Sequence, residues 1–255
     1  MFIDTHTHLY LNDFNEDRNE IITEALNLNI KKLLLPNIDS STIDDLIQLC
    51  EKNKNVCYPM IGLHPCSVNE NFQGELHNLH NYIKQINPIA IGEIGIDLYW
   101  DKTTLNEQLE AFKQQIKWAK DYNLPIVIHA RESYKEIFDV LDKINDDQLF
   151  GVFHCFSSSL SDAQHILNYG GFKLGIGGVV TFKNAGLDKT LSKIPLENII
   201  LETDSPYLAP APYRGKRNKS SYIALIAKKI SEIYNLKISE IEKITTKNAC
   251  EIFKF

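Results

Sequence analysis

The chain has 255 residues, 44% hydrophobic and 24% charged, which is an ordinary composition for a globular protein with a sizeable core. Its formal net charge is −6, so the molecule as a whole does not attract nucleic acid, and any phosphate must be bound at a local site. No apolar run approaches the ~20 residues that cross a bilayer, and no membrane partner is expected.

Short apolar runs rich in β-branched residues alternate along the chain with longer segments of helical period. The runs predict strands over 1–6, 32–36, 56–62, 89–93, 125–129, 150–154, 172–176 and 198–202. The other segments predict helices over 16–29, 40–53, 75–86, 104–121, 132–143, 160–169, 185–193, 219–235 and 239–253. Thr104 with Glu107, and Ser239 with Glu242, have the spacing of capping boxes at two of the helix starts.

This alternation predicts an α/β fold. Eight strands and their helices in about 250 residues match a (β/α)8 TIM barrel in number and size. A doubly wound open sheet is the main alternative, because the same alternation would serve it. No internal repeat, low-complexity segment or Pro/Gly-rich linker interrupts the pattern, so we expect a single domain over 1–255.

The ends of five predicted strands carry residue types that bind metals: His6, His8, Glu93, His129, His154 and Asp204. In a barrel, the carboxyl ends of all strands meet at one mouth, where barrel enzymes place their active sites. The spacing of two along a strand points His6 and His8 to the same side, with Thr5 and Thr7 facing away. Each residue alone has a structural explanation, such as a helix cap or an Asx turn. Their coincidence at one mouth favours a metal site.

Four histidines and two carboxylates, with no thiolate, suit borderline or hard divalent ions, which include Mg, Zn, Mn, Co and Ni. Six ligands are too many for one tetrahedral ion that keeps an open position, and they suffice for two ions if one carboxylate bridges. Two ions ~3.5–4 Å apart can hold both the attacking and the leaving oxygen of a phosphate ester. The residues therefore predict a dinuclear hydrolase.

Two further features are expected to reach the same mouth. His64 follows the third strand and is expected to contact substrate, the alternative being a turn histidine before Pro65. The stretch "APYRGKRNKSS" contains Arg214, Lys216 and Arg217, and such a basic run is usually a solvated loop. Beside the mouth it instead predicts phosphate binding, because an arginine can donate two hydrogen bonds to one phosphate.

Together these motifs resemble the TatD family of metal-dependent deoxyribonucleases, within the amidohydrolase-type TIM barrels. The motifs span essentially the whole chain in order: "DTHTHL", "GLHP", "GEIGID", "IHARES", "HCFSSS" and "ETDSPYLAPAPYRGKRN". The resemblance implies a division of the six ligands, with one metal held by His6, His8 and Asp204, the other by His129 and His154, and Glu93 bridging. It also implies hydrolysis of DNA phosphodiesters, most often as trimming of 3′ ends.

The expected function is therefore a deoxyribonuclease that acts 3′ to 5′ on single-stranded DNA ends through a hydroxide activated by two metals. We expect Glu93 and Asp204 to be catalytic, with Asp204 orienting the attacking water and accepting its proton. The acidic net charge predicts weak, local binding of DNA. The alternatives are a deacylase of D-aminoacyl-tRNA or another ester or amide hydrolase at the same site, and, least favoured, a metal-stabilised scaffold without activity.

The chain departs from the usual family pattern at three places: Cys66, Ser158 and the pair Lys219-Ser220. None is a proposed ligand, so the departures bear on loop geometry and substrate preference. The five cysteines are scattered without a CxxC pair, which favours free thiols and a cytoplasmic location. A monomer is expected, because no exposed apolar patch can be inferred.

Overall fold

Eight parallel strands form one sheet in chain order in the computed structural model, which describes residues 1–255. The strands are Phe2–Asp4 (β1), Ile30–Pro36 (β2), Cys57–Ile61 (β3), Ala90–Asp97 (β4), Ile126–Arg131 (β5), Gly151–Phe153 (β6), Phe172–Ile176 (β7) and Ile199–Leu201 (β8). The predicted (β/α)8 TIM barrel is confirmed. The doubly wound alternative is excluded, because its strand order reverses at a switch point and this order does not.

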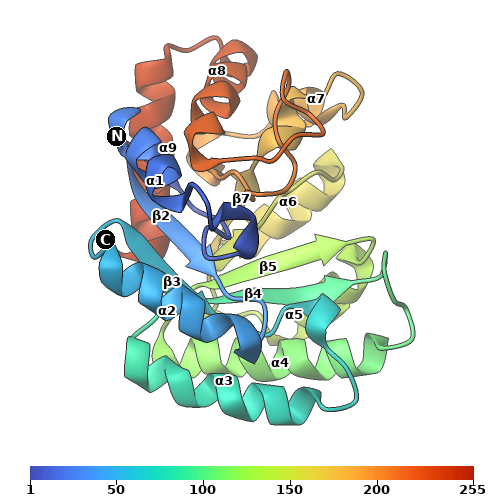
Figure 1. The fold of residues 1–255 in the computed structure, drawn as a ribbon. Coiled ribbons are helices and arrows are strands. Elements are labelled where there is room, and N and C mark those ends of the chain that lie inside the picture. Colours follow the sequence, from blue (N-terminus) through green and yellow to red (C-terminus); the bar gives the residue numbers. More distant parts are fainter.

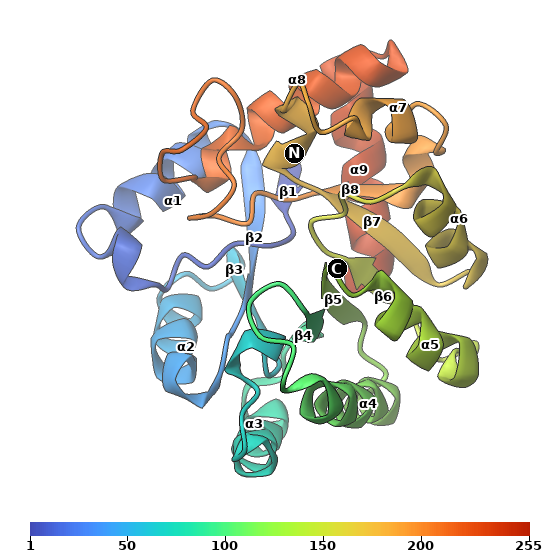
Figure 2. The same ribbon diagram turned by 90° about the vertical axis from the view of Figure 1, so that its right-hand side faces the viewer.

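Helices surround the strands as an outer ring (Figure 2). They are Arg18–Asn27 (α1), Ile43–Lys52 (α2), Phe72–Ile86 (α3), Leu105–Tyr122 (α4), Tyr134–Ile144 (α5), Leu160–Asn168 (α6), Leu187–Leu191 (α7), Ile223–Tyr234 (α8) and Ile238–Phe253 (α9). Figure 1 shows α8 and α9, in orange and red, beside each other. None of the helices is both long and apolar enough to cross a lipid bilayer.

The core has two parts. A cluster of 57 buried residues fills the space between strands and helices. A separate cluster of 10 combines side chains from seven strands with three from α9: Ile3, Leu34, Met60, Ala90, Val127, Val152, Ile200, Ala249, Ile252 and Phe253. Through these three residues α9 packs against the inner cluster, and it contacts β1 and β8. The mouth at the carboxyl ends is left for polar residues.

The barrel closes between β1 and β8 through individual backbone hydrogen bonds. The backbone N–H of Thr5 donates to Leu201 O (3.1 Å), that of Asp204 to His6 O (2.9 Å), and that of His8 to Ser205 O (2.7 Å). These contacts bring the segment after β1 against the segment after β8. Three of the candidate ligands are therefore neighbours because the barrel closes there.

Thr5 and Thr7 use their hydroxyl groups in the same seam. Thr5 Oγ1 donates to Leu201 O (3.1 Å), and Thr7 Oγ1 lies 2.6 Å from Ser205 Oγ. Both side chains thus bond to the segment around β8, in agreement with the expectation that they face away from the metal-binding side.

Neither of the two predicted capping boxes forms as expected. Thr104 does precede α4, but its side chain makes no cap; its Oγ1 accepts a hydrogen bond from Gln108 Nε2 instead (3.0 Å). At α9 the helix starts one residue early, so Glu240 rather than Glu242 accepts the backbone N–H of Lys237 (3.0 Å). Glu242 instead accepts a hydrogen bond from Asn29 (2.9 Å).

The largest difference concerns β4, which continues to Asp97 although the strand is predicted only over 89–93. All eight of its residues are buried, and Gly95 allows close pairing with β5, since a Cβ there would lie 2.1 Å from His129 O. The extension carries a second carboxylate, that of Asp97, to the mouth of the barrel.

Candidate metal centre

Glu93 lies at the centre of the candidate site, and one of its two carboxylate oxygens faces the histidines that follow β1. Its Oε2 is 3.1 Å from His6 Nε2 and 3.8 Å from His8 Nε2. The two Nε2 atoms are 3.3 Å apart. Asp204 Oδ1 lies 3.9 Å from the first of these nitrogens and 3.6 Å from the second. Four donor atoms therefore surround one point, as the ligands of a single ion would.

The other oxygen of Glu93 faces a second group of imidazoles. Its Oε1 is 2.8 Å from His129 Nδ1, 3.4 Å from His64 Nε2 and 3.7 Å from His154 Nε2. His64, expected to contact substrate, is thus also placed where it could bind a metal. His154 lies between the two groups, because its ring stacks on that of His6 with centroids 3.5 Å apart.

A β-bulge directs Glu93 to this position. Gly92 pairs with Val127 and Ile94 with Ile128, so Glu93 is an extra residue with no partner on β5. A bulge bends its strand and re-aims the extra side chain, which is why bulges are frequent next to active sites. The carboxylate consequently sits in the mouth with only 3% of its side chain exposed.

Two other residues of the centre have left-handed backbone conformations that side chains usually avoid. The φ angles are 60° at Asp204 and 48° at Cys155. Such conformations cost of order 1–3 kcal/mol each and cluster at functional sites. At Asp204 the conformation coincides with the hydrogen bond from its N–H to His6 O, which sets the carboxylate beside the histidines.

The carboxylates of the centre are ionised and attract positive charge. Burial alone would raise the pKa of Glu93, but the imidazoles of His64 and His6, among others, outweigh it and hold this pKa well below its usual range. The pKa of Asp204 is lowered in the same way against the effect of burial. Burial acts to lower the pKa of His154, yet the nearby carboxylates, Glu202 above all, raise it to about 10.

Carboxylates behind the histidines are the part of the site that the sequence patterns did not reveal. Asp97 Oδ2 is 2.8 Å from His129 Nε2, and Glu202 Oε1 is 2.9 Å from His154 Nδ1. Gly175 makes room for Glu202, since a Cβ there would lie 2.3 Å from Oε2. Metal-binding histidines usually donate their second N–H to such a carboxylate. The sequence feature that could have indicated Asp97 and Glu202 is an acidic residue directly after an apolar run.

His8 has a partner of another kind. The hydroxyl of Tyr10 donates to Pro36 O (2.8 Å), so its oxygen can accept the Nδ1–H of His8 at 3.1 Å. This leaves the lone pair on Nε2 of His8 directed at Glu93. His129 is bonded outward in the same way, to Asp97, so that ring nitrogens and carboxylate oxygens face one another.

The donor set fits divalent metal ions. Every ion-pair partner of Glu93 is a histidine rather than a lysine or arginine, so this buried carboxylate is surrounded by side chains that can themselves bind a metal. Imidazole nitrogens and carboxylate oxygens suit borderline or hard divalent ions. The Sγ of Cys155 also lies in a group with His154 and Asp204, and burial raises the pKa of this thiol well above its usual value.

A cavity of ≈ 960 Å³ opens above the centre, and its walls carry positive charge. Arg214 and Lys216 line it as expected, while Arg131 is a cation that the sequence patterns did not single out. Arg217 does not line it: its guanidinium binds Asp17 (Nη1 to Oδ1, 3.0 Å), so the structure does not bring this residue to the cavity with the other two.

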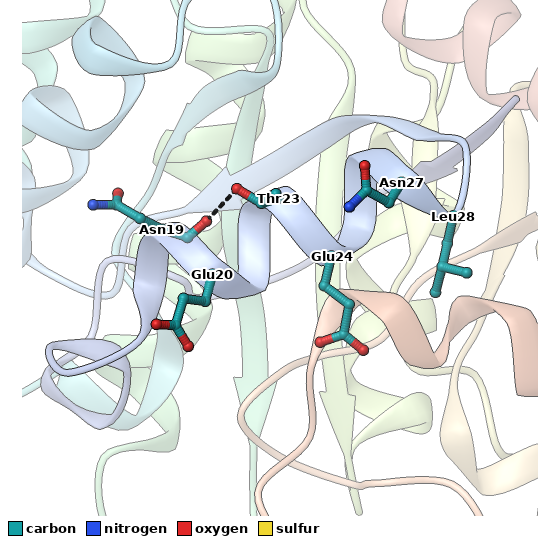
Figure 3. A pocket seen from close by; sticks show the side chains of 6 residues that line it. All are labelled: Asn19, Glu20, Thr23, Glu24, Asn27 and Leu28. Carbon is teal, nitrogen blue, oxygen red and sulfur yellow. Dashed lines mark hydrogen bonds between the residues drawn. The ribbon is translucent and has the colours of Figure 1, made fainter.

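A second hollow, of ≈ 510 Å³, lies on the outer face of α1 (Figure 3). It is lined by Asn19, Glu20, Thr23, Glu24, Asn27 and Leu28. Glu24 is bound by Lys219 Nζ at 2.7 Å, and no histidine or cysteine is present. The metal-binding residue types are therefore gathered at the barrel mouth and not here.

Comparison with known proteins gives consistent matches over the whole chain. The sequence model of the family described as "TatD related DNase" matches residues 3–254. An uncharacterised metal-dependent hydrolase of Bacillus subtilis, YabD, is 35% identical over 255 residues, which are 100% of this chain and 99% of that protein.

Solved structures show the same fold. The crystal structure of YjjV, a TatD homologue from Escherichia coli K12, has a TM-score of 0.93 with 26% identity and covers 100% of this chain and 98% of that one. An uncharacterised amidohydrolase from Saccharomyces cerevisiae has a TM-score of 0.86 with 19% identity and covers 98% and 99% of the two chains, a likeness of fold alone.

Proposed function

The chain belongs to the TatD-related DNase family of metal-dependent hydrolases, and on this premise we propose that it cleaves phosphodiester bonds of DNA at single-stranded ends. The observation that carries the proposal is the buried Glu93 carboxylate between two groups of imidazoles, below a cavity with cationic walls. The 3′ to 5′ direction implied by the family resemblance is part of the proposal.

Two divalent ions, from the set Mg, Zn, Mn, Co and Ni, are the proposed cofactors. Their proposed ligands are His6, His8 and Asp204 for one ion, His129 and His154 for the other, and Glu93 for both, with His64 as a further donor on the second side. When bound, such ions neutralise charge on the phosphoryl oxygens and make a water molecule a stronger nucleophile.

The protein's own residues supply the remaining steps. Asp204 orients the attacking water and accepts its proton, since its carboxylate is ionised and 12% exposed whereas that of Glu93 is only 3% exposed. Arg131, Arg214 and Lys216 bind the phosphates on either side of the cleaved bond. A DNA strand is then bound only at this local site, since the protein as a whole has a net charge of −6 and does not attract DNA.

The cationic walls favour a substrate that carries phosphates. A deacylase of D-aminoacyl-tRNA would use the same centre and the same cations, so the match to the DNase family is what favours the nuclease. A scaffold without activity would need neither the cavity nor ionised carboxylates facing it. The single domain, cytoplasmic location and monomeric state expected from the sequence stay predictions.

A substrate panel tests the proposal. Metal-loaded protein is incubated with 3′-labelled single-stranded DNA, the matching duplex, charged D-aminoacyl-tRNA and a simple phosphodiester, with each of the five candidate ions. We expect stepwise shortening of the single strand from its 3′ end. Release of the amino acid without cleavage of any phosphodiester would instead establish the deacylase, and metal binding with no turnover would establish the scaffold.

Asp97→Asn is expected to weaken binding of the second ion by about 10–100-fold, the range typical of carboxylates behind a metal-binding histidine. The substitution removes the charge 2.8 Å from His129 Nε2 and so lowers the basicity of the opposite nitrogen. Calorimetric titration with Mn or Zn measures the effect.

Asp101→Asn is the matched control, because Asp101 follows in the same loop and accepts hydrogen bonds only from Thr103. Equal metal affinities for Asp97→Asn and Asp101→Asn would contradict the proposed role of Asp97.

A further inference from the structure

Two large aromatic side chains are exposed just after β4, at the rim of the cavity. Trp100 is 70% exposed and Tyr99 is 49% exposed, whereas Trp118, the second tryptophan of the chain, is 5% exposed. Trp100 lines the cavity together with Glu93 and His129. An exposed tryptophan at the edge of a proposed active site indicates a place where a molecule binds, because the free side chain leaves a large apolar surface in water.

Asp97 fixes these aromatic residues relative to the metal centre. Its Oδ1 accepts the backbone N–H groups of Tyr99 (2.9 Å) and Trp100 (3.2 Å). Its Oδ2 is 2.8 Å from His129 Nε2. The carboxylate of Asp97 therefore holds both the backbone of Tyr99 and Trp100 and the candidate metal ligand His129. A molecule bound to the aromatic rings would lie in a defined position beside the metal centre.

A cation lies against the same rings. The guanidinium of Arg131 is 3.7 Å from the ring centroid of Tyr99 and 5.4 Å from that of Trp100, and Arg131 also lines the cavity. Lys102 of the same loop pairs with Glu132 (3.7 Å), while Arg131 has no carboxylate within ion-pair distance. Its N–H groups are thus available to an anion that reaches the cavity.

Exposed aromatic rings beside a free cation are how proteins bind single-stranded nucleic acid, with bases stacked on the rings and phosphates on the cation. Resting on the proposed nuclease function, we propose that Trp100 stacks against an unpaired nucleobase while Arg131 binds the phosphate next to it. A base inside a duplex has both faces covered by its neighbours. The aromatic rim therefore selects single-stranded or frayed ends.

Tryptophan fluorescence tests the stacking directly. In Trp118→Phe, Trp100 is the sole tryptophan, and Glu93→Gln in the same chain prevents cleavage of the probe. We expect single-stranded oligothymidylate to quench the emission, and a chain of the same length with abasic tetrahydrofuran sugars to leave it nearly unchanged. Equal quenching by both chains, or none when anisotropy shows the oligothymidylate to be bound, would overturn the proposal.

Equilibrium binding gives a second test that does not depend on Trp118→Phe folding. Trp100→Ala is expected to weaken binding of oligothymidylate about tenfold, as loss of one base–aromatic stack does, and to leave binding of the abasic chain unchanged. Trp100→Phe keeps a ring and is expected to restore most of the affinity. Phe255→Ala is the matched control, since Phe255 is 40% exposed beside Lys32 Nζ (4.1 Å) and outside the cavity.

The outcomes separate this proposal from the nuclease function. If the wild type cleaves DNA and Trp100→Ala binds and cleaves both chains as the wild type does, the stacking proposal is wrong and the nuclease stands. If the wild type cleaves no phosphodiester, the nuclease is wrong, and the fluorescence comparison of the two chains alone decides whether Trp100 binds a base.

Discussion

Glu93→Gln is expected to lower kcat/KM for DNA by at least about a thousandfold, more than the ten- to hundredfold typical of residues that only support a metal ligand. Glu93 faces His6 with one oxygen (3.1 Å) and His129 with the other (2.8 Å), so each imidazole group has an oxygen of the same carboxylate. Glutamine keeps the shape of the side chain and removes its charge, which leaves two cations without their shared anion.

Metal content separates this loss from unfolding. Elemental analysis after dialysis is expected to show two ions per chain in the wild type and one or none in Glu93→Gln, with unchanged circular dichroism. Glu132→Gln serves as control, because the side chain of Glu132 is 54% exposed and pairs only with Lys102. Two retained ions and full activity in Glu93→Gln would refute the bridging role.

Asp204→Asn has the second largest expected effect, a loss of about 10²–10⁴-fold in kcat, the usual contribution of a general base. Burial opposes ionisation of Asp204, but the nearby imidazoles of His8 and His154 outweigh it and keep the pKa of the carboxyl below its usual value. The carboxylate is thus ready to accept a proton. Asparagine retains an oxygen for metal binding and loses the base.

Comparing the loss of kcat with the loss of bound metal tests the role of Asp204 in Asp204→Asn. Steady-state kinetics at saturating metal are expected to show a large fall in kcat with little change in KM, while at least one ion remains bound. Asp188→Asn on the exposed side of α7 is the control and is expected to behave as the wild type. A fall in metal content that fully accounts for the lost activity would restrict Asp204 to a ligand.

The barrel could be predicted from the sequence because its signal is local. Apolar runs such as those around Val127 and Val152 contain the residues that face the barrel interior, and the amphipathic segments between them pack outside. Strand ends were less predictable. β4 continues to Asp97 because it pairs with β5 and packs closely against it at Gly95. The hydrophobicity of the segment alone does not reveal this pairing.

The basic run after β8 shows where local reasoning was insufficient. Arg214 and Lys216 reach the cavity, but Arg217 is bound by Asp17, and Arg131 from β5 contributes a cation in its place. Cations that are neighbours in the sequence thus differ in position, because the fold brings a carboxylate near one of them and not near the others. Counting charges along the chain could not distinguish them.

By itself, the sequence determined the architecture and the set of residues that meet at the mouth, because parallel strands in chain order bring all their carboxyl ends to one side. Tertiary structure decided how those residues meet. The bulge at Glu93, the contact of Asp97 with His129 and that of Glu202 with His154 join residues 32 or more positions apart. Their geometry depends on strand register and barrel closure, and these are settled only when the elements pack against one another.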